Sequence, residues 1–203
     1  RRSLKKKPTQ QELSEKIPRL KAFIRLQQRD LIDVYFADES GFNLQPNIPY
    51  GWQPIGEQWA FPSHKKQVLN TFGLLNVVNK HLVTYSTKPK QMVNSHFICQ
   101  SLDDFASKIK RLTVIILDNA PWHKSEQFFN RINYWQDQGL FIFHLPRYCP
   151  HLNLIETLWR KIKYEWLTTA DYNSKTALKR KLKFIYANFG NLFDIEFSMN
   201  FYL

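Results

Sequence analysis

Three acidic residues stand where carboxylates are able to bind a metal ion. Asp38 follows an alternating apolar stretch, and Asp118 directly follows the continuous apolar run Thr113–Leu117. Ligand sites of open α/β sheets lie outside the carboxyl ends of the strands, so these two carboxylates share one cleft if their strands are parallel neighbours. Side-by-side carboxylates repel each other unless a cation such as Mg²⁺ lies between them. In the alternative interpretation, each Asp only begins a turn or caps the next helix.

Glu156 is the third acid. Its segment carries one apolar helical stripe, formed by Ile155, Trp159, Ile162 and Trp166. At about 100° per residue, Glu156 lies at the edge of this stripe, with Arg160 and Lys163 following on the same side of the helix. An acid followed by basic residues on one side suits a metal ion beside a phosphate backbone. A solvated Glu–Arg pair at spacing i, i+4 is the alternative.

The surrounding charge favours a polyanionic substrate. The chain has 29 Lys and Arg residues against 17 Asp and Glu, a formal net charge of +12. Such a surface attracts nucleic acid first and anionic membranes second. Three acids in a basic surround are able to hold two Mg²⁺ ions for phosphoryl transfer. This pattern fits a nuclease or polynucleotidyl transferase better than a glycosidase.

Length and composition favour a globular chain of one or two domains. The chain has 203 residues, 43% of them hydrophobic, and its longest aliphatic run is only four residues, so no membrane partner is expected. Cys99 and Cys149 make no disulfide framework, which favours a reducing cytoplasmic setting. Because the chain opens on Arg1 rather than Met, we expect a fragment of a longer protein.

The N-terminal thirty residues differ in character from the rest. Five basic residues crowd the first seven positions, and a capping-box pattern at Thr9 then opens a helix to about Arg29, interrupted or restarted at Pro18. We expect residues 1–30 to form a basic arm and a helical linker, and residues 31–203 a catalytic domain. A solvated helix packed on the core is the alternative for 1–30.

The remaining pattern predicts an α/β order. Hydrophobic periodicity and turn residues place the strands at about 31–41, 67–78, 82–85, 113–117 and 140–145. Helices are expected at about 95–109, 125–138, 152–167 and 174–188. The order is thus three strands in a meander followed by alternating helices and strands.

Three strings resemble the DDE transposases of the mariner superfamily, with the bacterial insertion-sequence branch as the closer match. They are FADESG at 36–41, LDNAPWH at 117–123 and LPRYCPHLNLIETLW at 145–159. The resemblance implies an α/β ribonuclease H-like fold, with a mixed five-stranded sheet flanked by helices. It also implies that Asp38, Asp118 and Glu156 bind two Mg²⁺ ions, with Mn²⁺ able to substitute.

The same resemblance implies an activity and its partners. These are cleavage of DNA strands at transposon ends, attack of the freed 3′-hydroxyl on target DNA, and a homodimer on duplex DNA at the bacterial nucleoid. It also implies a helix-turn-helix region before residue 30. Cys149 and Leu154 replace the family's usual Ser and Pro, and 37 residues separate Asp118 from Glu156. Two alternatives therefore stay open: a nuclease without strand transfer, and a decayed transposase that only binds DNA.

Five basic residues are candidates for DNA contact: His123, Arg160, Lys163, Lys179 and Lys183. Each has a plainer interpretation, since buried histidines are often structural and runs of charge are usually solvated. Glu39 is left out of the site, because adjacent residues of a strand point to opposite faces.

Overall fold

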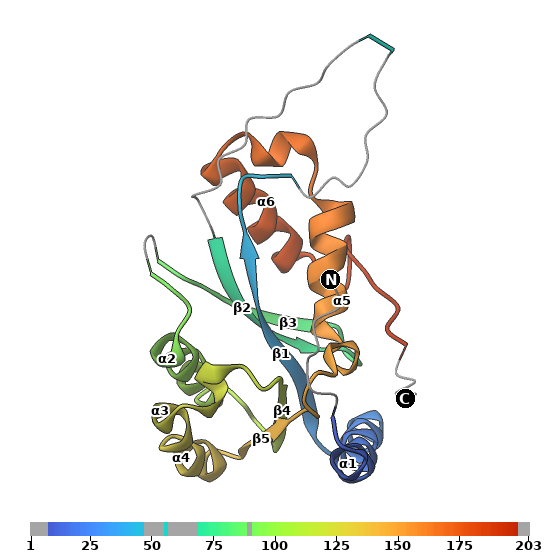
Figure 1. Ribbon diagram of the computed structural model, residues 1–203, viewed down its shortest axis with the longest axis vertical. Helices are drawn as coiled ribbons and strands as arrows, with labels where there is room; N and C mark the ends of the chain where they lie inside the picture. The colour runs from blue at the N-terminus through green and yellow to red at the C-terminus, as the bar shows by residue number, and fades with distance from the viewer. Residues whose placement is uncertain (1–7, 47–54, 57–68, 89–90, 199–203) are drawn as a thin grey trace.

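A five-stranded mixed sheet forms the centre of the molecule (Figure 1). The computed structural model describes residues 8–46, 55–56, 69–88 and 91–198. The strands are β1 (Asp33–Phe42), β2 (Leu69–Asn76), β3 (His81–Ser86), β4 (Thr113–Leu117) and β5 (Leu140–His144). Their order is β3-β2-β1-β4-β5, with β1 to β3 antiparallel and β1, β4 and β5 parallel. This topology confirms the expected fold class.

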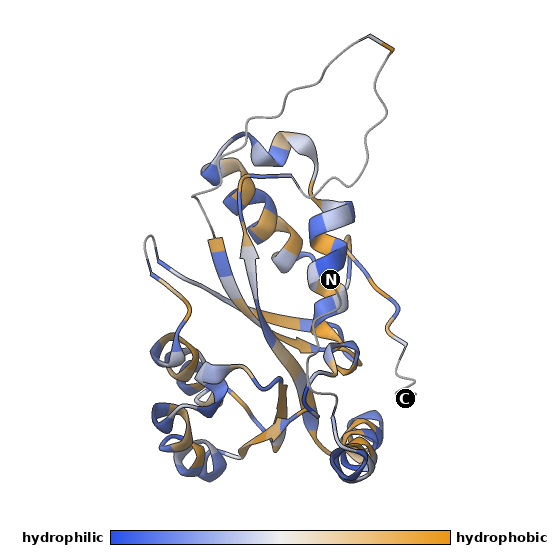
Figure 2. Ribbon diagram, in the orientation of Figure 1, coloured by the Kyte–Doolittle hydropathy of each residue, from blue (hydrophilic) through white to orange (hydrophobic). Residues whose placement is uncertain are grey.

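Helices cover both faces of the sheet (Figure 1). The α-helices are α1 (Gln10–Gln28), α2 (Ser95–Ala106), α3 (Glu126–Phe129), α4 (Ile132–Asp137), α5 (Ile155–Lys161) and α6 (Lys175–Ala187). One apolar cluster joins α1, α5 and α6 to one face of β1, and a second joins α2, α3 and α4 to the other. Figure 2 shows the apolar sides of these helices turned toward the sheet. Because side chains alternate along a strand, each face of β1 belongs to a different layer.

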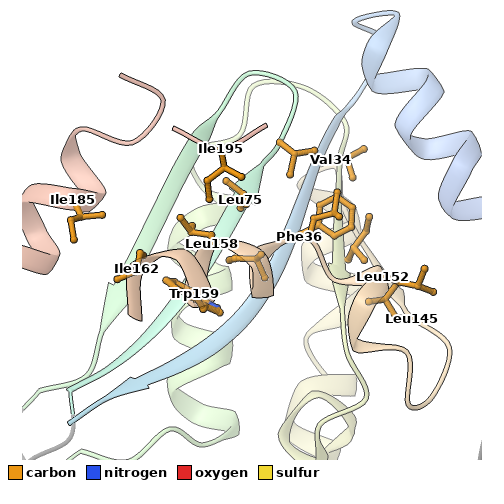
Figure 3. Packing of buried hydrophobic residues seen from close by; sticks show 14 of the residues in the cluster. Val34, Phe36, Leu75, Leu145, Leu152, Leu158, Trp159, Ile162, Ile185 and Ile195 are labelled. Atoms are coloured by element: carbon orange, nitrogen blue, oxygen red, sulfur yellow. The ribbon is translucent and has the colours of Figure 1, made fainter. Parts of the chain in front are cut away.

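Helix α5 packs unusually close to the sheet. Trp159 of α5 is buried beside Leu158 and Ile162 (Figure 3). Its indole ring lies over Gly73 of β2, where a methyl group would come within 2.6 Å of Trp159 Cζ2. Only a residue without a side chain leaves room for the ring. Gly73 pairs with Asp38 in the β1–β2 register, so this contact sets the height of α5 above the acidic end of β1.

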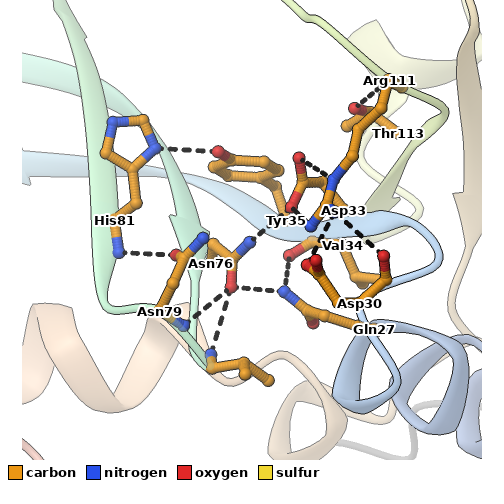
Figure 4. A network of polar contacts seen from close by, with 11 residues as sticks. Gln27, Asp30, Asp33, Val34, Tyr35, Asn76, Asn79, His81, Arg111 and Thr113 are labelled. Carbon is orange, nitrogen blue, oxygen red and sulfur yellow. Dashed lines mark hydrogen bonds and ion pairs between the residues drawn. The ribbon is translucent and has the colours of Figure 1, made fainter.

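Helix α1 is built into the domain by a buried polar network (Figure 4). The Gln27 side chain donates hydrogen bonds to Asn76 Oδ1 and to the Val34 carbonyl, and both Gln27 and Asn76 are buried. Asn76 in turn donates to Asp33, which accepts two hydrogen bonds from Arg111. Together with apolar packing from Ile17, Leu20 and Ile24, these contacts fix α1 against the site-bearing face.

Several element boundaries differ from the expectation. Helix α1 passes through Pro18 without a break. Proline has no N–H to donate to the carbonyl of Ser14, one turn earlier. Because Ser14 and Pro18 are both solvent-exposed, water is able to bond to that carbonyl. The helix expected over 125–138 divides at Asn130–Arg131, where Arg131 forms an ion pair with Asp103. Residues 1–7 of the expected basic arm, and 67–68 of the second strand, lie outside the described residues.

The helix expected over 152–167 also has three parts. A 3₁₀ turn (Pro150–Leu152) precedes α5, and a π-helical turn (Ile162–Trp166) follows it. The four expected stripe residues nevertheless share one side, with Ile155, Trp159 and Ile162 buried. Among the described residues, no helix is both long and apolar enough to cross a bilayer.

Candidate active site

The strand register brings Asp38 and Asp118 together. Phe36 of β1 pairs with Ile116 of β4 in parallel, so the same register extended by two residues sets Asp38 opposite Asp118. Neighbouring strands lie about 4.8 Å apart. Strand β4 ends at Leu117 whereas β1 continues to Phe42. The two acids therefore stand at the opening where β4 leaves the sheet, rather than both following the end of a strand as expected.

Glu156 reaches the same opening from the first turn of α5. Its backbone N–H donates to the Asn153 carbonyl at 3.0 Å. The side chain of Asn153, itself buried, donates to the carbonyl of Ala37 at 3.1 Å. One residue thus ties the turn that carries Glu156 to the peptide just before Asp38. No individual role was predicted for Asn153.

Two adjoining hollows surround the three acids. One, of about 470 Å³, is lined by Asp38 and Glu156 together with Arg160 and Lys163. The other, of about 500 Å³, is lined by Asp118 and Glu156. Asn153 and Glu156 line both, so they form the ridge between them. The structure thus brings together all three acids and two of the five basic candidates.

The electrostatics show that the acids act on one another. Burial, and then the negative charges of Glu39, Asp118 and Glu156, hold the pKa of Asp38 well above its ordinary value. Burial and the charge of Asp118 likewise raise the pKa of Glu156, against the opposing effect of Arg160. Such a cluster stabilises a cation placed among it, since the cation relieves the mutual repulsion.

These side chains fit Mg²⁺ by donor type. Carboxylate oxygens are the hard ligands that Mg²⁺ prefers, whereas thiols and imidazoles favour softer metals. Within the described part of the chain, no three His, Cys, Asp or Glu side chains are already drawn close enough to coordinate one ion.

His123 supports Asp118 from behind. Its Nδ1 lies 2.9 Å from Asp118 Oδ1, and its Nε2 lies 2.9 Å from Glu39 Oε1. Burial lowers the pKa of His123, but hydrogen bonds to Asp118 and Glu39, with their charges, outweigh it and raise the value to about 9. For Asp118, burial raises the pKa, but hydrogen bonds from His123 and the Ala120 N–H bring it below the ordinary value.

This arrangement corrects two expectations. His123 has no exposed surface and both ring nitrogens are engaged, so in this structure it cannot contact a DNA phosphate directly. Glu39, which was left out of the site, lines the same hollow as Asp38 and is linked to Asp118 through His123. No sequence spacing indicates this link, because Glu39 and His123 are 84 positions apart.

Lys179 and Lys183 lie elsewhere. With Lys175 they line a separate hollow between α6 and the ends of β2 and β3. Thr71, which also lines it, pairs with Ser40, two residues beyond Asp38 on the same face of β1. The α6 lysines thus share a face of the sheet with the acids without sharing their hollows.

Sequence comparison assigns the family. The family model described as DDE superfamily endonuclease matches residues 33–179, which contain all three acids. The chain belongs to the DDE superfamily endonucleases. No sequence among the curated proteins matches it.

Solved structures agree with this DDE endonuclease fold. The catalytic domain of Mos1 mariner transposase is similar at 12% identity, with a TM-score of 0.55 over 90% of this chain and 84% of that one. The Mos1 paired-end complex with Mn is similar at 14% identity, with a TM-score of 0.62, over 92% of this chain and 58% of that one. The Mos1 strand transfer complex is similar at 15% identity, with a TM-score of 0.59, over 92% of this chain and 58% of that one. The chain spans less than two thirds of the Mos1 chains in these complexes. The bacterial insertion-sequence branch stays a prediction.

Proposed function

We propose that this DDE endonuclease domain is the catalytic core of a DNA transposase. It cleaves strands at transposon ends and joins the freed 3′-hydroxyl to target DNA. The observation that carries the proposal is the meeting of Asp38, Asp118 and Glu156 around two adjoining hollows. The similar Mos1 structures are described as a strand transfer complex and paired-end complexes with Mn and with Mg, which supports the same chemistry here.

In this proposal Asp38, Asp118 and Glu156 hold two Mg²⁺ ions, with Mn²⁺ able to replace them. When bound, such ions lower the pKa of an attacking water or 3′-hydroxyl and neutralise the charge on the leaving oxygen. The protein contributes carboxylates held at a fixed spacing by the β1–β4 register and by Asn153. His123 holds one oxygen of Asp118, which fixes the direction of that carboxylate.

The basic residues beside the acids bind the DNA backbone. Arg160 and Lys163 line the same hollow as Asp38 and Glu156, where their charges attract phosphates. Burial lowers the pKa of Lys163, and the nearby charge of Asp38 opposes that shift. We assign Lys179 and Lys183 to a second stretch of backbone on the same face.

The proposal extends to partners and context. The partner is duplex DNA, both transposon ends and target, bound by a homodimer at the bacterial nucleoid in the cytoplasm. Residues 1–30 link this domain, 31–203, to a DNA-end-binding region. The paired-end complexes among the similar structures support two copies acting together.

Strand cleavage tests the proposal through Glu156→Gln, which keeps the shape of the side chain and removes its charge. Supercoiled plasmid is incubated with the chain and Mn²⁺, and nicked product is measured alongside the circular dichroism spectrum. We expect nicking to collapse while the fold survives. Glu165→Gln is the matched control, because Glu165 is an exposed acid on the following turn that forms an ion pair with Lys161.

Each outcome distinguishes a function. Full nicking by Glu156→Gln contradicts the assignment of the site. Wild-type chain that binds plasmid and never nicks it favours the decayed transposase. Capture of labelled 3′-hydroxyl ends into the plasmid separates a transposase from a nuclease without strand transfer.

A further inference from the structure

The hollow that Asp118 and Glu156 line is also lined by basic residues. Lys124 and Arg147 line it from two loops, one after β4 and one after β5. Both residues are exposed, and neither forms an ion pair with any described residue. Two cations without counter-ions therefore face the same space as two carboxylates.

Helix α1 places a third cation next to the residues that line this hollow. Lys16 Nζ donates to the Leu145 carbonyl at 3.2 Å, and Leu145 lines the hollow. Glu12 of the same helix accepts from Lys16 at 3.3 Å and from the Arg147 backbone N–H at 3.2 Å. The Lys16 side chain is 25% exposed. Helix α1 thus fixes both its own lysine and the loop that carries Arg147.

Positive charge is in excess around Lys16, Lys124 and Arg147. Glu12 is the acid beside these three cations, and its Oε1 accepts hydrogen bonds from the Lys16 side chain and from the Arg147 backbone N–H. Burial, and then the charges of Arg147 and Lys16, lower the pKa of Lys124, whereas the negative charges of Glu12 and Asp118 oppose this shift. The three cations therefore repel one another, and a bound anion relieves that repulsion.

We infer that Lys16, Lys124 and Arg147 form a binding site for one phosphodiester group of the DNA strand. The neighbouring phosphodiester bond of the same strand then faces Asp118 and Glu156. The inference deepens the proposed function and rests on it. A hollow of about 500 Å³ that is lined by Lys124 and Arg147 as well as by the two acids has room for a stretch of backbone. The inference also gives α1 a part in positioning the strand, through Lys16 and its bond to the Leu145 carbonyl.

The salt dependence of duplex binding tests this site without any cleavage. A 30-base-pair duplex is titrated in EDTA between 50 and 300 mM KCl, and log Kd is plotted against log salt concentration. Each phosphate contact contributes about 0.9 to the slope. Because the three cations hold one phosphodiester group, we expect the triple variant Lys16→Met, Lys124→Ala and Arg147→Ala to lose about 0.9 from the slope magnitude. The double variant, which keeps Lys16, loses less.

The matched control is Lys108→Ala with Lys110→Ala. It removes two positive charges before β4, at the end of the strand remote from Asp118. We expect its slope to match that of the wild type. Thermal unfolding of each variant checks the fold. The double variant keeps the hydrogen bonds from Lys16 to the Leu145 carbonyl and from the Arg147 backbone N–H to Glu12.

The outcomes separate this inference from the proposed function. A triple variant with a wild-type slope overturns the inference, even if nicking still depends on Glu156. A wild-type chain that binds no duplex overturns both. Competition by inorganic phosphate below 1 mM marks a site for a free phosphate ion, and contradicts the assignment to DNA.

Discussion

Gly73→Ala is expected to damage the site by moving a helix rather than by touching the acids. A methyl group at position 73 would lie 2.6 and 2.7 Å from two ring carbons of Trp159 and 3.0 Å from Ile155 Cδ1. Ordinary contact begins at 3.4 Å, so the indole must retreat by about 0.8 Å. Trp159 is only 4% exposed, so most of its surface is packed against neighbouring residues.

The cost follows from overpacking of a dense core. Inserting one methyl group costs about 1–3 kcal/mol, which lowers the melting temperature of a chain of this size by about 2–4 °C per kcal/mol. Glu156 lies one helical turn before Trp159, so a retreat of the ring shifts Glu156 relative to Asp38. Because a 1 Å misplacement costs about 100-fold in rate, we expect nicking to fall by roughly 10- to 100-fold.

A double-mutant cycle with Trp159→Phe assigns the cause. The smaller ring lacks the two carbons nearest to position 73, so the double variant should be more stable than the summed single effects predict, by about 1 kcal/mol or more. Chemical unfolding monitored by circular dichroism gives the stabilities, and plasmid nicking gives the activities. Additive losses, or a Gly73→Ala variant as stable and active as the wild type, would refute the reasoning.

Two further changes test the supports of the site, and a third tests the raised pKa of Tyr35. His123→Phe leaves Glu39 without its imidazole partner, and we expect a loss of about 2 kcal/mol in unfolding free energy and 10- to 100-fold weaker Mn²⁺ binding by calorimetry; unchanged Mn²⁺ affinity contradicts this. Asn153→Ala removes the hydrogen bond to Ala37, so we expect the free energy of unfolding to fall by about 1 kcal/mol and nicking to fall at least tenfold. Asn153→Asp also lacks the amide donor. If Asn153→Asp loses as much stability and as much nicking as Asn153→Ala, the role of Asn153 is purely structural. Burial, and then the charge of Asp33, raise the pKa of Tyr35 to about 12 from 10.0, so the unfolded chain loses this proton first and stability falls as pH rises from 10 to 12. In Tyr35→Phe that decline is shallower by up to about 1.4 kcal/mol per pH unit, measured by urea unfolding; an identical decline contradicts the assignment.

Local sequence patterns predicted most of the scaffold. The continuous apolar run Thr113–Leu117 matches β4 residue for residue, because a strand buried on both faces must be apolar throughout. Asn94 caps α2 as its residue type favours. The position of Asp118 followed from its strand, whereas Asp38 was expected at the end of a strand and lies inside β1, which continues to Phe42.

Long-range contacts account for what the sequence could not predict. Nothing local indicates that Glu39 reaches His123, or that Lys16 reaches the loop after β5, since these partners are 84 and 129 positions apart. Helices α3 and α4 divide where Arg131 and Trp135 both reach Asp103, which is a tertiary constraint. Periodicity alone describes such a segment as one helix.

Binding of Mn²⁺ in the absence of DNA tests the central claim most directly, because it asks whether the three carboxylates form one site. Calorimetry would compare the wild-type chain, Asp118→Asn, and the control Asp137→Asn, which changes an exposed acid at the end of α4. We predict that the wild type and the control bind Mn²⁺ alike and that Asp118→Asn binds at least tenfold more weakly. Equal binding by all three proteins would contradict a metal site built on Asp118.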